Sequence, residues 1–212
     1  MRKVLLALVF SFCGTVAAMA GVRIAALGDS LTQGYGLPEV QGFVPQMQAW
    51  LKAAGSDAVV INAGVSGDTT AGGAARVGWT LSPDVGAMMV ILGGNDMLRG
   101  IDPGVARANL ETILQAAQAA EVKVLLVGMQ APGNYGPDYK TQFDALYPDL
   151  AAEYGALFAP SFFAGLQAEV GDDPAALRPF MQGDGIHPNA EGVKRIVAAL
   201  GPKVLELVRA AE

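Results

Sequence analysis

Residues 85–92, VGAMMVIL, form an uninterrupted apolar run near the middle of the chain. A strand that is covered by helices on both faces needs such a run, because its side chains alternate between two buried surfaces. Pro83 and Asp84 precede the run and Gly93 and Gly94 follow it, so turn residues bound it on both sides. The run therefore predicts a central strand of a parallel sheet.

Short apolar runs alternate with longer stretches of helical spacing along the rest of the chain. The pattern predicts strands over residues 22–27, 58–62, 85–92, 122–127 and 156–159, and helices over residues 43–54, 69–81, 103–120, 139–154 and 189–211. Pro148 is expected to break its helix, and Gly201-Pro202 to interrupt the last one. Alternating strands and helices predict one α/β domain with a five-stranded parallel sheet between two helical layers.

The first twenty residues have the pattern of a secretory signal peptide rather than of a folded segment. Arg2 and Lys3 precede an apolar run over residues 4–12, and Ala18-Met19-Ala20 fits a small-x-small cleavage site. The alternative, an uncleaved anchor, is weakened because the run is short for a span of ~20 residues. We therefore expect a signal peptide over residues 1–20, a single domain over 21–212, no stable membrane anchor after cleavage, and a periplasmic or secreted protein.

Composition excludes several kinds of site in the expected mature chain. Its only cysteine, Cys13, leaves with the signal, so no disulfide, thiol nucleophile or cysteine metal site is expected. Lys plus Arg falls from 14 to 12 against 20 acidic residues, so the net charge changes from −6 to −8, which disfavours a nucleic-acid partner. A single histidine is too few for zinc. We expect no metal and no cofactor, and the sequence does not specify the oligomeric state.

Polar and glycine-rich clusters follow the first three predicted strands directly, at residues 28–30, 64–68 and 93–96. The carboxyl ends of parallel strands meet at one sheet edge, where the ligand crevice of such folds lies. Ser30 follows the first strand, and a serine hydroxyl needs a base to become a nucleophile. His187 is the only histidine, and Asp184 lies three residues before it in a turn that Gly185 permits. The residues thus predict a catalytic triad of Ser30, His187 and Asp184.

Acyl transfer also needs hydrogen-bond donors for the developing oxyanion. The candidates are the backbone N–H groups of Ser30 and Gly67 and the side-chain amide of Asn95. Ser66 is an alternative nucleophile, since AGVSGD approaches the G-x-S-x-G elbow, although Asp68 replaces the last glycine. Asp29 and Asp96 are interpreted as structural residues of their turns.

Four segments in this order resemble the four blocks of the SGNH (GDSL) hydrolase superfamily: GDSL at residues 28–31, Gly67 within AGVSGDT, GGND at 93–96 and DGIHPN at 184–189. The resemblance implies a flavodoxin-like three-layer α/β/α sandwich. It also implies the roles given above for Ser30, His187 and Asp184, and for Ser30, Gly67 and Asn95. GDSLTQGYGL, SGDTTAGGAARV, GGNDMLRG and APGNYGPDY are most similar to the exported arylesterase, lysophospholipase and acyl-thioesterase group, which implies a small acyl ester or thioester as substrate.

An apolar lining for the acyl chain is expected from residues near the predicted edge: Met97, Leu98, Met129, Ala131, Pro132, Phe180, Ile186 and Pro188. Arg99 would meet a polar or anionic head group, or else pair with a surface acid. Residues 129–140, with two glycines and two prolines, are expected to form a mobile active-site loop. Two other functions stay open: a carbohydrate O-acetyl esterase with the same machinery, and a non-catalytic periplasmic ligand-binding module.

Overall fold

The computed structural model describes residues 21–171 and 173–212, so the predicted signal peptide over residues 1–20, with Cys13, lies outside the described residues. Five strands form one sheet in which every neighbouring pair is parallel, in the order β2-β1-β3-β4-β5. The strands are β1 (Arg23–Gly28), β2 (Val59–Gly64), β3 (Ala87–Ile91), β4 (Lys123–Val127) and β5 (Leu157–Ala159). This is the flavodoxin-like order, and it confirms the predicted fold class.

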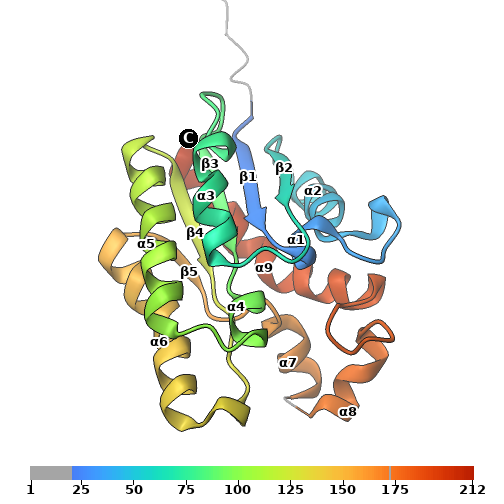
Figure 1. Ribbon diagram of the computed structural model, residues 1–212. Coiled ribbons are helices and arrows are strands. Elements are labelled where there is room, and N and C mark those ends of the chain that lie inside the picture. The colour runs from blue at the N-terminus through green and yellow to red at the C-terminus, as the bar shows by residue number, and fades with distance from the viewer. Residues whose placement is uncertain (1–20, 172) are drawn as a thin grey trace, which may run out of the picture.

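Helices cover both faces of the sheet, which gives three layers (Figure 1). The helices α3, α5 and α6 pack side by side on one face, and α2, α7 and α9 pack together on the other. Their bounds are α2 (Phe43–Ala53), α3 (Thr70–Thr80), α5 (Pro103–Ala119), α6 (Pro137–Tyr154), α7 (Ala164–Val170) and α9 (Ala190–Ala211). Shorter helical turns lie between them: α1 (Ser30–Gln33), η1 (Glu39–Gln41), α4 (Gly94–Leu98), η2 (Gly133–Tyr135), α8 (Pro174–Leu177) and η3 (Arg178–Phe180).

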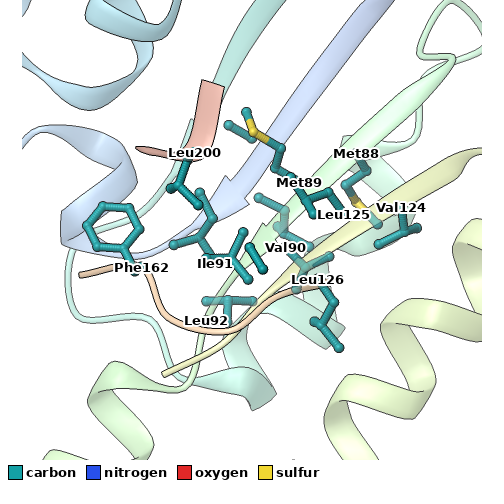
Figure 2. Packing of buried hydrophobic residues seen from close by; sticks show 14 of the residues in the cluster. Met88, Met89, Val90, Ile91, Leu92, Val124, Leu125, Leu126, Phe162 and Leu200 are labelled. Carbon is teal, nitrogen blue, oxygen red and sulfur yellow. The ribbon is translucent and has the colours of Figure 1, made fainter. Parts of the chain in front are cut away.

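The central strand β3 is buried along its whole length, as its apolar run predicts. Its residues pack against β4, Phe162 and Leu200 in a continuous hydrophobic cluster (Figure 2). Each such side chain contributes about 1.5–3 kcal/mol when it is fully removed from water. A core of this kind holds the strand ends, from which the loops at the carboxyl edge leave, in fixed positions.

Two predicted helix interruptions are wrong. The helix α6 continues through Pro148 and α9 continues through Gly201 and Pro202. Both prolines lie on exposed helix faces, where water can satisfy the carbonyl that loses its intrahelical partner. Gly201 is buried against the Trp50 ring of α2, so it permits close helix packing instead of ending the helix.

Candidate active site

Ser30 lies where β1 passes into the single-turn helix α1 at the carboxyl edge of the sheet (Figure 1). Asp29 caps this turn, because its Oδ1 accepts a hydrogen bond of 2.9 Å from the Leu31 N–H. Gly28 fits only without a side chain, since a Cβ there would lie 2.0 Å from Thr32 Oγ1 and 2.9 Å from the Ile91 carbonyl. The strand end and the cap therefore fix the backbone that carries the Ser30 hydroxyl.

A continuous chain of hydrogen bonds joins Ser30, His187 and Asp184. Ser30 Oγ lies 2.9 Å from His187 Nε2, although 157 positions separate the two residues along the chain. His187 Nδ1 lies 2.7 Å from Asp184 Oδ2. The structure thus brings together the three residues that the sequence analysis singled out for the triad.

The turn before His187 sets the charge of Asp184 and the tautomer of the ring. Asp184 Oδ1 accepts the N–H groups of Ile186 at 2.9 Å and of His187 at 3.0 Å, in a turn where Gly185 has a φ of +68°. The backbone hydrogen bond from His187, together with the hydrogen bond from its side chain, lowers the pKa of Asp184 from 3.8 to about 2. An ionised carboxylate only accepts, so Nδ1 carries the proton of the neutral ring and Nε2 is left to accept the Ser30 proton.

Gln182 anchors the His187 segment to the loop that follows α1. Its backbone N–H donates to the His187 carbonyl at 2.7 Å, and its side-chain Nε2 donates to the carbonyls of Tyr35 at 2.8 Å and Pro188 at 3.0 Å. The Tyr35 ring lies against the His187 ring with 4.7 Å between centroids. No sequence pattern marks Gln182 and Tyr35, because their partners are backbone carbonyls and a ring that only the fold brings close.

The three expected oxyanion donors lie on neighbouring loops. Within the described residues, the backbone N–H groups of Ser30 and Gly67 donate to no protein acceptor, and Gly67 has a φ of +85°. Asn95 Nδ2 donates to the Asp68 carbonyl at 2.9 Å and, more weakly, to Asp29 Oδ2 at 3.3 Å. The longer of these two contacts is the one that a ligand oxygen would displace most easily.

Asp29, directly before Ser30 in the chain, is nearly inaccessible to solvent. Burial raises its pKa from 3.8 to about 6, against the lowering effects of the Leu31 N–H, the Asn95 amide and the His187 ring, and with a smaller raising effect of Asp68. Its carboxyl oxygens bond the Leu31 N–H and the Asn95 amide, which agrees with the structural role expected for it.

Asp96 and Ser66 are engaged away from His187. The buried Asp96 accepts the backbone N–H of Thr70 at 2.8 Å and its hydroxyl at 2.6 Å, so it ties α4 to the start of α3. Ser66 Oγ donates to Gln33 Oε1 at 3.0 Å on the surface. Neither side chain is placed to take part in proton transfer with the histidine.

The residues expected to line the acyl site separate into three groups by their exposure to solvent. Leu98, Pro132 and Ile186 are exposed, Met97 and Phe180 are half-buried, and Met129, Ala131 and Pro188 are buried. Ala131 is fixed to α6, because its N–H donates to Asp144 and its carbonyl accepts from Lys140, both at 2.7 Å. Arg99 is exposed, and its Nη2 donates to the Gly67 carbonyl at 2.8 Å rather than to a surface acid.

A shallow depression lies beside Ser30. It is lined by Ser30, Leu31, Gly34, Tyr35, Leu37, His187, Pro188 and Val193, and holds about 10 Å³. A larger cavity of about 290 Å³ lies at the opposite, amino-terminal edge of the sheet, between α5, β4 and the segment before β5, far from the triad. Among the described residues, no group of three or more His, Cys, Asp or Glu side chains is arranged to hold a metal ion.

The sequence and the fold are similar to those of known hydrolases. Residues 26–195 match the GDSL-like lipase/acylhydrolase family. Esterase TesA of Pseudomonas aeruginosa is 38% identical over 190 residues, covering 89% of this chain and 90% of that protein. Thioesterase 1/protease 1/lysophospholipase L1 of Escherichia coli K12 is 34% identical over 197 residues, covering 92% and 88%. The crystal structure of AlinE4, an SGNH-hydrolase family esterase, matches with a TM-score of 0.70 at 41% identity, covering 88% of this chain and 96% of that one.

Proposed function

This chain belongs to the GDSL-like lipase/acylhydrolase family and is an ester hydrolase, and we propose that Ser30, His187 and Asp184 carry out its reaction. The observation that supports this assignment is the hydrogen-bond chain from Ser30 Oγ through the His187 ring to the Asp184 carboxylate. A nucleophile, a base within 2.9 Å of it and a group that orients the base are the parts that covalent acyl transfer requires.

In the first step, Ser30 Oγ attacks the acyl carbonyl carbon while its proton passes to His187 Nε2. The new C–O bond turns the carbonyl oxygen into an oxyanion, and the positive ring is stabilised by the Asp184 carboxylate. The N–H groups of Ser30 and Gly67 and the amide of Asn95 stabilise the oxyanion, each such donor being worth about 10²–10³ in rate.

The tetrahedral intermediate collapses when its bond to the leaving group breaks. His187 gives its proton to the leaving alcohol or thiol, which departs and leaves the acyl group on Ser30. Water then gives a proton to His187 Nε2 and attacks the acyl carbon. A second collapse releases the carboxylic acid and returns the proton to Ser30.

The substrate class that we propose is a small acyl ester, such as an aryl ester or a lysophospholipid, with acyl thioesters as further substrates. The exposed Tyr35 supports an acyl group, since it lines the depression beside Ser30. The exposed Leu98 at the end of α4 and Ile186 directly before His187 offer further apolar surface. Apolar sites discriminate by about 1–3 kcal/mol per methylene, so the chain-length preference is expected to be broad.

Hydrolysis of p-nitrophenyl acetate and p-nitrophenyl octanoate by the purified protein and by Ser30→Ala tests the proposal. We expect the variant to lose essentially all activity while remaining folded by circular dichroism. Ser66→Ala is the matched control, because it removes a serine hydroxyl on the neighbouring loop that bonds only Gln33. Equal rates for the wild type and Ser30→Ala would remove the proposed mechanism and assign the reaction to a nucleophile other than Ser30.

A carbohydrate O-acetyl esterase is the second candidate, because the same groups would act on a small acetyl ester. The shallow depression is the observation that favours it, as an acetyl group needs little room. A strong preference for acetylated sugars over octanoyl esters would decide for this candidate and against the lipid-like substrates.

We also propose that residues 1–20 are a signal peptide and that residues 21–212 act as one domain in the periplasm or outside the cell. The basic start, the apolar run and the Ala18-Met19-Ala20 site support this. Across residues 21–171 and 173–212, no helix combines the length and the apolar character needed to cross a membrane.

A further inference from the structure

Arg76, on the sheet-facing side of α3, joins three chain segments at the carboxyl edge. Its Nε forms an ion pair of 2.7 Å with Asp68 Oδ2, its Nη1 donates to the Ala63 carbonyl at 2.7 Å, and its Nη2 donates to the Gly28 carbonyl at 2.9 Å. The Arg76 and Asp68 side chains are 23% and 18% exposed, so water weakens this pair less than it weakens an ordinary surface pair. The three nitrogens of the guanidinium group thus hold the ends of β1 and β2 and the turn that follows β2.

The residues that Arg76 contacts lie close to all three proposed oxyanion donors. Gly28 lies two residues before Ser30, and Asp68 directly follows Gly67. The Asp68 carbonyl accepts the Asn95 amide at 2.9 Å. The Arg76–Asp68 pair is therefore within one hydrogen bond or two residues of each donor, although neither side chain contacts the triad.

The local sequence makes room for this pair. A Cβ on Gly72 would lie 2.4 Å from Asp68 Oδ1, so only glycine at that position leaves the carboxylate where Arg76 meets it. Arg76 follows Gly72 by four positions on the same helix face. The planar fork of arginine suits three acceptors in different directions, whereas lysine offers a single nitrogen.

We propose that the Arg76–Asp68 pair is a positioning unit that aligns the three oxyanion donors for the transition state. This inference rests on the proposed function, because the donors matter only if Ser30 attacks an acyl carbon. Donors that stabilise a transition state must be fixed before the reaction, and a shift of about 1 Å in a reacting group can cost about 10²-fold in rate. A pair that only stabilised α3 would change the folded fraction and leave the rate of the folded enzyme unchanged.

The test compares Arg76→Lys, which keeps the charge, with Asp68→Asn, which keeps the shape and the backbone carbonyl. Arg107→Lys is the matched control, since Arg107 pairs with Glu111 and Glu153 on α5 and α6 without contacting a site residue. We measure kcat and KM on p-nitrophenyl butyrate for the folded fraction. We also measure inhibition by an alkyl trifluoromethyl ketone, whose carbonyl carbon bonds to Ser30 Oγ, with the proton passing to His187 and the oxygen becoming an oxyanion.

For both variants at the pair, kcat is expected to fall about 10- to 100-fold with KM within about twofold of wild type. The inhibition constant of the ketone is expected to rise in parallel, and Arg107→Lys to match wild type in every value. Combining Asp68→Asn with Asn95→Ala is expected to lower kcat by less than the product of the two single effects, because both changes disturb the same donor.

Unchanged kcat in the folded variants would overturn the inference. A loss of kcat without a rise in the inhibition constant of the ketone would also overturn it. If neither variant yields folded protein, the pair is a folding element and the inference is likewise overturned. These outcomes differ from failure of the proposed function, in which Ser30→Ala would retain the activity of the wild type.

Discussion

At the scale of single residues, the proposed mechanism makes the direction of proton transfer depend on Asp184. Its Oδ1 already accepts two backbone N–H groups, so an asparagine there would place its NH₂ group opposite His187 Nδ1. That arrangement favours a proton on Nε2, which then cannot accept the Ser30 proton. We expect Asp184→Asn to lower kcat by about 10²–10⁴, judged from the same change in a serine protease, with little effect on KM in p-nitrophenyl ester assays. A variant within threefold of wild type would contradict this role.

The same carboxylate has a defined effect on stability against pH. Its pKa is lowered from 3.8 to about 2, so the folded state favours the ionised form. The resulting stabilisation is present above about pH 4 and is lost as the pH falls toward 2. We expect the difference in unfolding free energy between wild type and Asp184→Asn to shrink over this range in urea titrations. Because Asp184 is largely ionised above pH 3, any change of wild-type activity with pH above that value is expected to arise from another group.

The pKa of Asp29 is shifted in the opposite direction from that of Asp184, so its effect on the pH dependence of stability is expected to be opposite as well. Burial raises its pKa from 3.8 to about 6, so between these pH values the folded state keeps a proton that the unfolded state releases. Stability is therefore lost as the pH rises from about 4 to 6, by about 3 kcal/mol for a pKa difference of this size. In Asp29→Asn this decline is expected to be smaller by that amount in urea titrations at several pH values. If the unfolding free energies of the two proteins change with pH in parallel, the raised pKa of the buried Asp29 carboxyl would be contradicted.

At the scale of helices and strands, replacing glycine with alanine is expected to change the unfolding free energy in opposite directions at two positions. A Cβ on Gly201 would lie 2.5–2.7 Å from the Trp50 ring, so Gly201→Ala must push α9 away from α2. We expect a loss of about 1–3 kcal/mol in unfolding free energy. Gly78 in α3 has no atom within 4 Å of such a Cβ, so Gly78→Ala is expected to add about 0.5–1 kcal/mol through helix propensity.

Chemical denaturation of the two alanine variants measures both effects. Neither glycine lies at the triad, so kcat for the folded protein is expected to stay at the wild-type value in each. A stable Gly201→Ala protein would mean that the two helices can separate without loss of core packing.

The elements that the sequence predicted well are those whose pattern is determined by burial. Each predicted strand occurs within about two residues. The reason is clearest for β3, which is buried along its whole length and therefore apolar throughout. The effects of Pro148 and Pro202 were predicted wrongly, because tolerance of a proline depends on which helix face meets water, and that depends on the tertiary fold. The single-turn helices α1 and α4 were missed, since one turn is too short to show a helical period.

At the scale of the whole molecule, the sheet topology explains why the site could be anticipated only in part. Ser30 and Asn95 follow β1 and β3, which are neighbours in the sheet, and the rule for parallel sheets brings such loops together. Arg76 and Gln182 escaped the sequence analysis because they bind backbone carbonyls of distant segments. Every residue has a carbonyl, so no residue type marks these acceptors before the fold is known.

The start of the folded domain gives a prediction for the molecule as a whole. The Val22 carbonyl already accepts the Val59 N–H at 2.9 Å, and a Cβ on Gly21 would lie 2.2 Å from the Asp57 carbonyl. The chain therefore enters the sheet immediately after the predicted cleavage site at Ala20. We expect the full chain, expressed in a Gram-negative host, to be recovered from the periplasm with Gly21 at its N-terminus by intact mass.

Two further chains test this boundary. A chain that starts at Gly21 after an initiator Met is expected to fold without export and to match the kcat of the exported enzyme, because the described core begins with β1. A chain that starts at residue 27 lacks most of β1, the strand that lies between β2 and β3. This shorter chain is expected to be insoluble. Recovery of the exported protein with residues 1–20 still attached would instead indicate an uncleaved anchor, because an intact apolar run would hold the domain at the membrane.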